Sequence, residues 1–158
     1  MMSVEPSGTA EHLPENLQDI VDDFAAVEDA QKLQLLLEFA NELPDLPEHY
    51  TDHPELLEPV PECQSPIFLI TEVEPGESAG DRIVRLHFSA PAEAPTTRGF
   101  AGILHEGLDG QSVDTVLSVL AGDLGMRLSL TDSVSPLRLR GLSGMLSRIQ
   151  RQVQQQVQ

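Results

Sequence analysis

A cluster of prolines near the middle of the chain is the feature that most constrains the fold. Five prolines fall within residues 44–62, among many acidic residues. Proline lacks a backbone amide and fixes its φ angle, so neither a long helix nor a central strand can run through this segment. We therefore expect an extended connector, with a short edge strand around 58–62, between two regularly patterned parts of the chain.

The segment before the prolines has the periodicity of two helices. Apolar residues recur at intervals of three and four from Leu17 to Val27, which predicts an amphipathic helix beginning at Pro14. The same spacing predicts a second helix near residues 30–43, and the two should form a hairpin. Residues 1–13 are small, polar and interrupted by Pro and Gly, so we expect a flexible tail there.

The segment after the prolines begins with two predicted strands. Residues 66–73 are rich in β-branched and aromatic residues, and residues 82–90 alternate apolar and polar side chains. A turn with Pro and Gly separates them, which favours an antiparallel hairpin. Short helices should follow, one capped by Thr96 or Thr97 and closed by Gly107, and one capped by Ser112.

The last predicted helix begins at Ser135-Pro136, a capping hydroxyl followed by proline at the first helical position. Its apolar stripe runs from Leu139 to Val153, and we expect the Gln-rich end, 150–158, to fray. The whole pattern predicts one α+β domain over residues 14–152, followed by a frayed tail over 153–158. A small antiparallel sheet flanked by helices is the expected architecture.

The charge of the chain limits its partners. Lys and Arg total 9 and Asp and Glu total 26, for a net charge of −17. Such a chain repels phosphate backbones, which argues against nucleic acids and anionic membranes as partners. No apolar run approaches the roughly 20 residues of a bilayer span, and the N-terminus does not resemble a signal peptide. We expect a soluble, cytoplasmic protein.

The single cysteine, Cys63, is the main candidate for chemistry. It forms no internal disulfide, and alone it cannot hold an iron–sulfur cluster or a structural zinc ion. Pro61 and Pro66 favour an extended junction that presents the side chain outward. Glu62 should raise the pKa of the thiol, so an Arg, a helix N-terminus or a partner protein must activate it.

Other polar motifs have simpler interpretations. His49 and His53 stand four residues apart, but the prolines around them argue against a shared helical face and favour a solvated loop over a metal site. His87 and His105 are most simply structural. The glycines of 99–102 lack the context of a nucleotide-binding loop, and close packing of a helix explains them better. We expect no cofactor and no metal.

Three blocks of sequence together resemble the SufE-like sulfur-acceptor family. They are Cys63-Gln64-Ser65 before an apolar strand, Arg98-Gly99-Phe100-Ala101-Gly102-Ile103-Leu104, and Ser135-Pro136-Leu137-Arg138-Leu139-Arg140-Gly141-Leu142 followed by Met145. The blocks occur in the family's order and span most of the chain. The resemblance implies a fold shared with IscU-type cluster scaffolds, whose three cluster-binding cysteines this chain lacks.

The resemblance also implies a role in iron–sulfur cluster assembly. Cys63 would accept sulfane sulfur from the persulfide of a pyridoxal-phosphate cysteine desulfurase of the SufS type and pass it to a scaffold complex. The protein would then be a persulfide carrier and desulfurase activator, not an enzyme itself. Gln64, Ser65 and Arg138 are the candidate supporting residues. Many relatives have Gly where this chain has Glu62, and Gln where it has Pro66, and both replacements stiffen the loop.

Two other classes remain open. In a pure interaction module, Cys63 would be packing and the acidic front half, with a net charge of −15 over residues 1–62, would bind a partner. A thiol-dependent redox protein would need a thiol of low pKa, against which Glu62 argues. Arg138 likewise has two interpretations: a cation that stabilises the thiolate, or a partner in an ion pair with an acidic residue of the front half. The ion pair is slightly favoured.

Overall fold

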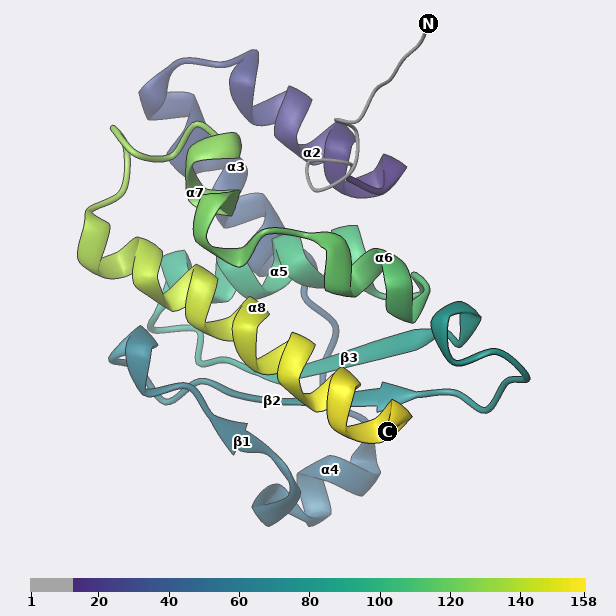
Figure 1. Ribbon diagram of the computed structural model, residues 1–158. Helices are drawn as coiled ribbons and strands as arrows, with labels where there is room; N and C mark the ends of the chain where they lie inside the picture. Colours follow the sequence, from purple (N-terminus) through teal and green to yellow (C-terminus); the bar gives the residue numbers. More distant parts are fainter. Residues whose placement is uncertain (1–12) are drawn as a thin grey trace, which may run out of the picture.

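The computed structural model describes residues 13–158, which form a three-stranded antiparallel sheet covered mainly on one face by helices (Figure 1). The strands lie in the order β1-β2-β3. The elements are α2 (Glu15–Ala25), α3 (Asp29–Glu42), α4 (Glu48–Asp52), β1 (Glu58–Pro59), β2 (Phe68–Val73), β3 (Val84–Ser89), α5 (Pro95–Leu108), α6 (Val113–Ser118), α7 (Leu124–Arg127) and α8 (Pro136–Val157), with short 3-10 turns that include Pro61–Cys63. The predicted α+β class and small antiparallel sheet are confirmed.

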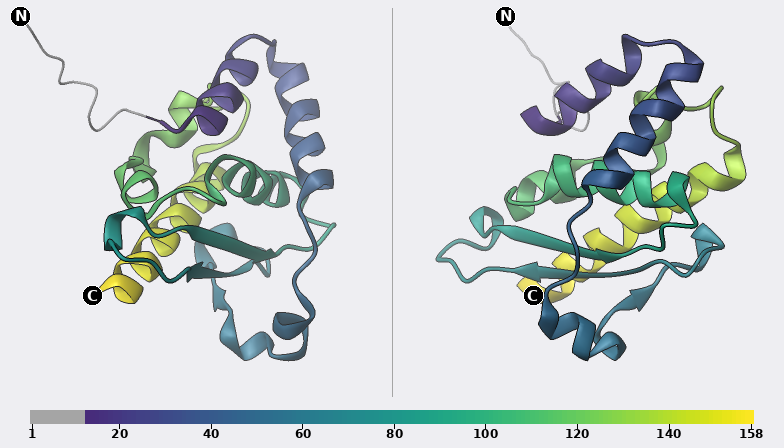
Figure 2. Two further views of the ribbon diagram at one scale, coloured as in Figure 1. Left: turned by 90° about the vertical axis from the view of Figure 1, so that its right-hand side faces the viewer. Right: turned by 180° about the vertical axis from the view of Figure 1, so that it is seen from behind.

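The register of the sheet sorts its side chains by face. Leu69 pairs with Phe88, and Thr71 pairs with Leu86; all four are buried on the helix-covered face. Successive side chains of a strand point to opposite faces, so Ile70 and Glu72 point the other way, as do their cross-strand partners His87 and Arg85. In the side views of Figure 2, α4 lies beyond that second face, on the opposite side from the helical hairpin.

The helical hairpin of α2 and α3 forms as predicted and packs on α5. The contact is close because α5 carries glycines where α3 approaches. A Cβ atom added to Gly99 would lie 2.6 Å from the Leu36 carbonyl oxygen, and one added to Gly102 would lie 2.2 Å from that of Phe39. The interpretation of these glycines as packing residues is confirmed, since any larger residue would push the helices apart.

Helix α8 crosses the molecule beside β2 and pairs with the free edge of that strand (Figure 1). Strand β1 covers only Phe68 and Leu69 of β2. Beyond it, the Gln152 side chain accepts a hydrogen bond from the Thr71 amide at 2.7 Å, and the Gln156 side chain accepts one from the Val73 amide at 3.0 Å. Gln156 also donates to the Thr71 carbonyl oxygen at 2.6 Å. The two glutamines thus replace a neighbouring strand.

The predicted fraying of the C-terminal residues 150–158 is wrong, because these contacts hold the end of α8 in place. Helix α8 continues to Val157, and Val153 is fully buried. A Gln-rich sequence has no apolar signal of its own, but here its amides satisfy backbone groups that would otherwise remain unpaired. At the other end, Leu13 is buried although it was expected in the tail; residues 1–12 of that tail lie outside the described residues.

Both boundaries of one helix also differ from prediction, and one short helix was not predicted. Ser112 and Ser135 cap α6 and α8 as expected. Helix α5, however, begins with Pro95 at its first turn and has no threonine cap. It runs past Gly107, which lies against Leu17 and is a packing glycine rather than a terminator. The proline-rich connector contains the one-turn helix α4. Within residues 13–158, no helix is both long and apolar enough to cross a bilayer.

Candidate functional site

Cys63 lies on a short turn, residues 61–66, which we call the cysteine turn. The base of the turn is fixed, since Val60 and Ile67 are both buried in the core and the Val60 amide donates to the Ile67 carbonyl oxygen at 2.9 Å. Pro61–Cys63 forms a 3-10 turn, and Gln64 ends it with a left-handed backbone, φ 58°. The prediction of an extended junction was therefore wrong in detail, because the chain turns back sharply between its two prolines.

The turn rests on helix α8 through small residues. A Cβ atom added to Gly141 would lie 2.9 Å from Cys63 Sγ, and one added to Gly144 would lie 3.0 Å from the Glu62 side chain. Cys63 Sγ lies 3.7 Å from the Gly141 carbonyl oxygen, which can accept a weak thiol hydrogen bond. The thiol is therefore half-buried between the turn and the helix.

This environment disfavours the thiolate. Burial raises the pKa of Cys63 to about 12, the Glu62 carboxylate contributes in the same direction, and the Arg148 guanidinium opposes both. At neutral pH the group is a thiol, a weak nucleophile compared with the thiolate. The predicted direction of the Glu62 effect is confirmed, and burial is the larger cause.

A cavity of about 400 Å³ opens beside the thiol. It is lined by Cys63, Gln64 and Ser65 from the turn, by Glu93, Ala94, Pro95 and Thr97 at the start of α5, and by Arg138 from the first turn of α8. The structure therefore brings together all four residues selected from the sequence. The space beside Sγ is large enough for an added sulfur atom and for part of an incoming group.

Arg138 faces this cavity and is exposed. Over residues 13–158, it makes no ion pair with an acidic residue of the front half, contrary to the slightly favoured alternative. The reason is its position, since Glu58 and Glu62 meet α8 further along, at Arg148 and Arg151. The guanidinium is thus available to an anion in the cavity.

Sequence reasoning missed an ionic network next to the cysteine. Arg148 donates to Glu62 at 2.8 Å and 3.0 Å and to Glu58 at 2.7 Å. Arg151 and Gln152 also bind Glu58. The partners are separated by about ninety residues in the chain, so no local spacing indicated that they would meet.

The histidines of the connector lie elsewhere. His49 and His53 have ring centroids 5.6 Å apart, so the expectation that they would not share a face was wrong: α4 supplies the turn that brings them together. On the sheet, His87 bonds Glu72 at 3.2 Å, and Tyr50 donates to the same carboxylate. Among residues 13–158, no group of three or more His, Cys, Asp or Glu side chains is placed to hold a metal ion.

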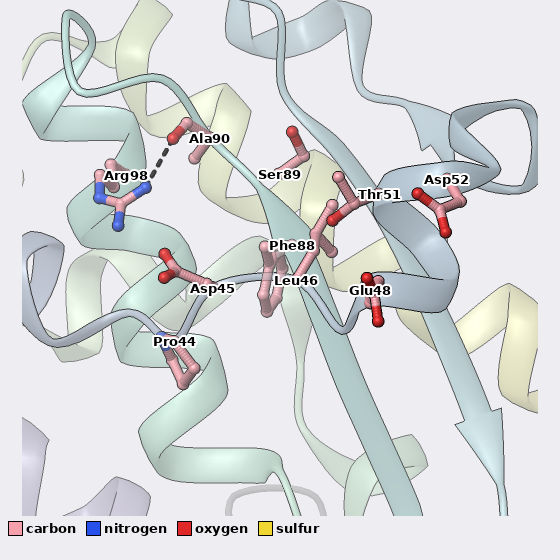
Figure 3. A pocket seen from close by; sticks show the side chains of 10 residues that line it. All are labelled: Pro44, Asp45, Leu46, Glu48, Thr51, Asp52, Phe88, Ser89, Ala90 and Arg98. Carbon is pink, nitrogen blue, oxygen red and sulfur yellow. Dashed lines mark hydrogen bonds between the residues drawn. The ribbon is translucent and has the colours of Figure 1, made fainter.

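A larger cavity, of about 620 Å³, lies between the connector and the end of β3 (Figure 3). Asp45, Glu48 and Asp52 line it, together with Arg98. Arg98 is structural, because its guanidinium donates to the carbonyl oxygens of Ala40 at 2.8 Å and Ala90 at 2.6 Å, which joins the end of α3 to the end of β3. No cysteine lines this cavity, and its acidic side chains would repel an anionic ligand.

The fold and the site together define a small α+β protein with one sheltered thiol on a turn, beside an arginine-lined cavity. The chain belongs to the SufE family: the family model described as SufE, Fe-S metabolism associated domain, matches residues 18–153. The family resemblance inferred from the three sequence blocks is confirmed.

Known relatives cover most of the chain. An uncharacterised SufE-like protein of Mycobacterium tuberculosis, known from strains CDC 1551 and H37Rv, is 53% identical over 143 residues, 90% of this chain and 94% of the relative. SufE-like protein 1, chloroplastic/mitochondrial, of Arabidopsis thaliana is 28% identical over 142 residues, 89% of this chain but 35% of the plant protein. The solution structure of a hypothetical protein from Thermus thermophilus is similar with a TM-score of 0.75 and 39% identity, covering 90% of this chain and 96% of that one.

Proposed function

We propose that this protein is a sulfur carrier for iron–sulfur cluster assembly, with Cys63 as the acceptor. The observation that carries the proposal is the placement of the chain's only thiol on a turn that rests on α8 beside a cavity, while the base of the turn is fixed in the core. Membership of a family associated with Fe–S metabolism supports it. A reducing cytoplasm is the compartment that suits a free thiol.

The transfer step needs no metal or cofactor in this chain. Cys63 first loses its proton to solvent or to a base of the donor. The Cys63 thiolate then attacks the outer sulfur of the persulfide on a SufS-type cysteine desulfurase. A new S–S bond forms at Cys63, the donor's S–S bond breaks, and the donor cysteine leaves as its thiolate. The desulfurase is free for another turnover, and the carrier passes the sulfur on to a scaffold complex.

The resting site keeps Cys63 protected. A thiol whose pKa is about 12 reacts slowly with adventitious oxidants and electrophiles, because little thiolate is present. Reaction with the donor therefore requires the turn to move or a cation to approach. Arg138, on the wall of the same cavity, is suited to stabilise the negative charge of the thiolate and of the persulfide that follows. Gln64 and Ser65 line the same cavity and can contact the incoming group.

The test is direct mass measurement of the intact protein. Incubation with a SufS-type cysteine desulfurase and free cysteine should add the mass of sulfur to the wild-type chain, and Cys63→Ser should abolish the addition because no other thiol is present. Arg138→Gln should slow the addition about tenfold, as expected for loss of one charge-assisted interaction of about 1.4 kcal/mol, and leave its final extent unchanged.

The controls are the same mixture without cysteine and a reduced sample, in which the added mass should disappear. An unchanged mass of the wild-type protein after many desulfurase turnovers would refute the carrier role.

The packing of the thiol on Gly141 favours one alternative, an interaction module in which Cys63 is structural. That protein would still bind and stimulate a desulfurase after Cys63→Ser, since stimulation would come from docking alone. Measurement of alanine production by the desulfurase separates the two: a carrier loses its stimulation with the substitution, and a module retains it.

A further inference from the structure

Within residues 13–158, the backbone hydrogen bonds of the cysteine turn run within the turn and to its base. The Cys63 amide donates to the Val60 carbonyl at 3.1 Å, the Gln64 amide to that of Pro61 at 3.1 Å, and the Ile67 amide to that of Ser65 at 2.7 Å. In the described part of the chain, no backbone hydrogen bond joins residues 61–66 to α8. Contacts that involve side chains therefore hold the turn on the helix.

Two of those contacts differ greatly in strength. The Cys63 thiol meets the Gly141 carbonyl at 3.7 Å, a long contact from a weak donor. Glu62 accepts from Arg148 at 2.8 Å and 3.0 Å, a short charge-assisted pair. The side chains of Arg148 and Glu62 are 24% and 36% exposed, so the pair is partly shielded from water. The ion pair is the stronger of the two contacts.

The partners of this pair are held unequally. Arg148 also binds Glu58, which is bound in turn by Arg151 and Gln152 from the same helix. Within residues 13–158, Glu62 has Arg148 as its sole ion-pair partner. If Glu62 leaves, the guanidinium keeps a carboxylate partner, and the turn loses that ion pair with α8. The network can therefore open on the Glu62 side while its Glu58 side stays closed.

We propose that Arg148 is a positioning residue that holds the cysteine turn closed through Glu62, and that separation of this ion pair, which we call the latch, precedes exposure of the Cys63 thiol. The role of this opening in sulfur transfer rests on the proposed function; the opening itself does not. Opening requires the turn to pivot on Val60 and Ile67, which remain in the core.

Alkylation of Cys63 by iodoacetamide measures the opening without any partner protein. The latch and simple electrostatics predict opposite results for Arg148. If the guanidinium only stabilises the thiolate, then Arg148→Gln slows alkylation, because Arg148 lowers the pKa of Cys63. If it holds the turn closed, Arg148→Gln and Glu62→Gln both accelerate alkylation. We expect about a fivefold increase for each, the factor that corresponds to about 1 kcal/mol.

The matched control is Arg151→Gln, which removes a neighbouring arginine that binds Glu58 but not Glu62. It should leave the alkylation rate within about twofold of the wild type, since surface pairs of this kind contribute little. Arg148→Lys should stay closer to the wild type than Arg148→Gln. The double variant Glu62→Gln with Arg148→Gln should react no faster than the faster single variant, because both changes remove one interaction.

Low concentrations of urea test whether iodoacetamide reaches Cys63 through global unfolding of the protein. Local opening of one turn exposes little surface, so the alkylation rate should not change with urea below the unfolding transition. Slower or unchanged alkylation of Arg148→Gln overturns the proposal, whatever the rate of Glu62→Gln, because removal of the Glu62 charge alone also lowers the pKa of Cys63 and speeds alkylation. Because the alkylation assay contains no desulfurase, that result does not contradict the carrier role. Conversely, absence of sulfur addition in the mass assay does not contradict the latch.

Discussion

At the scale of single residues, Cys63 shows how position changes chemistry. The same thiol exposed in an unfolded chain would ionise near its ordinary pKa of 9.0, but burial and Glu62 raise that value to about 12. In the proposed carrier role, this raised pKa would keep the thiol unreactive until a donor docks. Gln64 contributes to the placement of the thiol, since its left-handed backbone closes the turn immediately after Cys63.

The raised pKa predicts a specific pH dependence. Below pH 9 the thiol keeps its proton in the folded and the unfolded chain alike. Between about 9 and 12 the unfolded chain loses the proton while the folded chain retains it, so the folded state loses relative stability as the pH rises. The free energy of unfolding, measured in urea at several pH values, should therefore fall more steeply for the wild type than for Cys63→Ser over this range.

Alkylation provides the second measurement of the same property. The rate in the folded protein should go on rising above pH 9, whereas the urea-unfolded protein should level off near that value. A folded-state rate that levels off near pH 9 would contradict the raised pKa.

At the scale of secondary-structure elements, the C-terminal half of α8 acts as a substitute strand. Gln152 and Gln156 satisfy backbone groups of β2 where β1 no longer reaches. An uncovered strand edge is a template for pairing with other chains, and natural proteins cover or disrupt such edges. The glutamine-rich end of the helix is thus part of the folded domain.

Gln152→Ala should destabilise the fold by about 1–3 kcal/mol, because the Thr71 amide would lose its acceptor in a residue that is only 2% exposed. Urea unfolding measures the effect. Gln154→Ala is the matched control: it makes the same exchange on the same helix at an exposed position, and should change stability by less than about 0.5 kcal/mol. Equal effects of the two substitutions would show that the edge contact contributes nothing.

At the scale of the whole molecule, the charge of −17 dominates the electrostatics. The described ion pairs use few of the acidic residues, so most carboxylates face solvent and repel one another. The exposed arginines of α8, Arg138 and Arg140, lie near the cysteine turn against this negative background. These arginines lie beside the acidic side chains of Glu62 and Glu93, so the site presents charges of both signs to a protein partner.

Net repulsion predicts that salt stabilises the protein. Adding sodium chloride should raise the midpoint of thermal unfolding by several degrees, since screening weakens long-range repulsion more than it weakens the few part-buried pairs. The same series on a variant with Asp23→Asn and Glu38→Gln, two exposed acids of the front half, should show a smaller increase. A midpoint that falls with salt would mean that the ion pairs outweigh the repulsion.

Local patterns in the sequence were sufficient for most of the fold. Helical periodicity, strand alternation and the Ser135-Pro136 cap depend on neighbours a few residues apart, and the predicted helical hairpin, strand hairpin and last helix are all present. The uniqueness of Cys63 and the sign of the Glu62 effect were likewise available from the sequence, because both are properties of adjacent residues.

The tertiary structure alone decided what surrounds the thiol. The Glu62–Arg148 pair spans 86 residues, and the Gln152–Thr71 contact spans 81. Such pairings depend on where α8 crosses the turn and the sheet, and that crossing is set by core packing around residues such as Met145 and Ile149 rather than by any local propensity. Burial of Cys63, and with it the height of its pKa, follows from the same crossing.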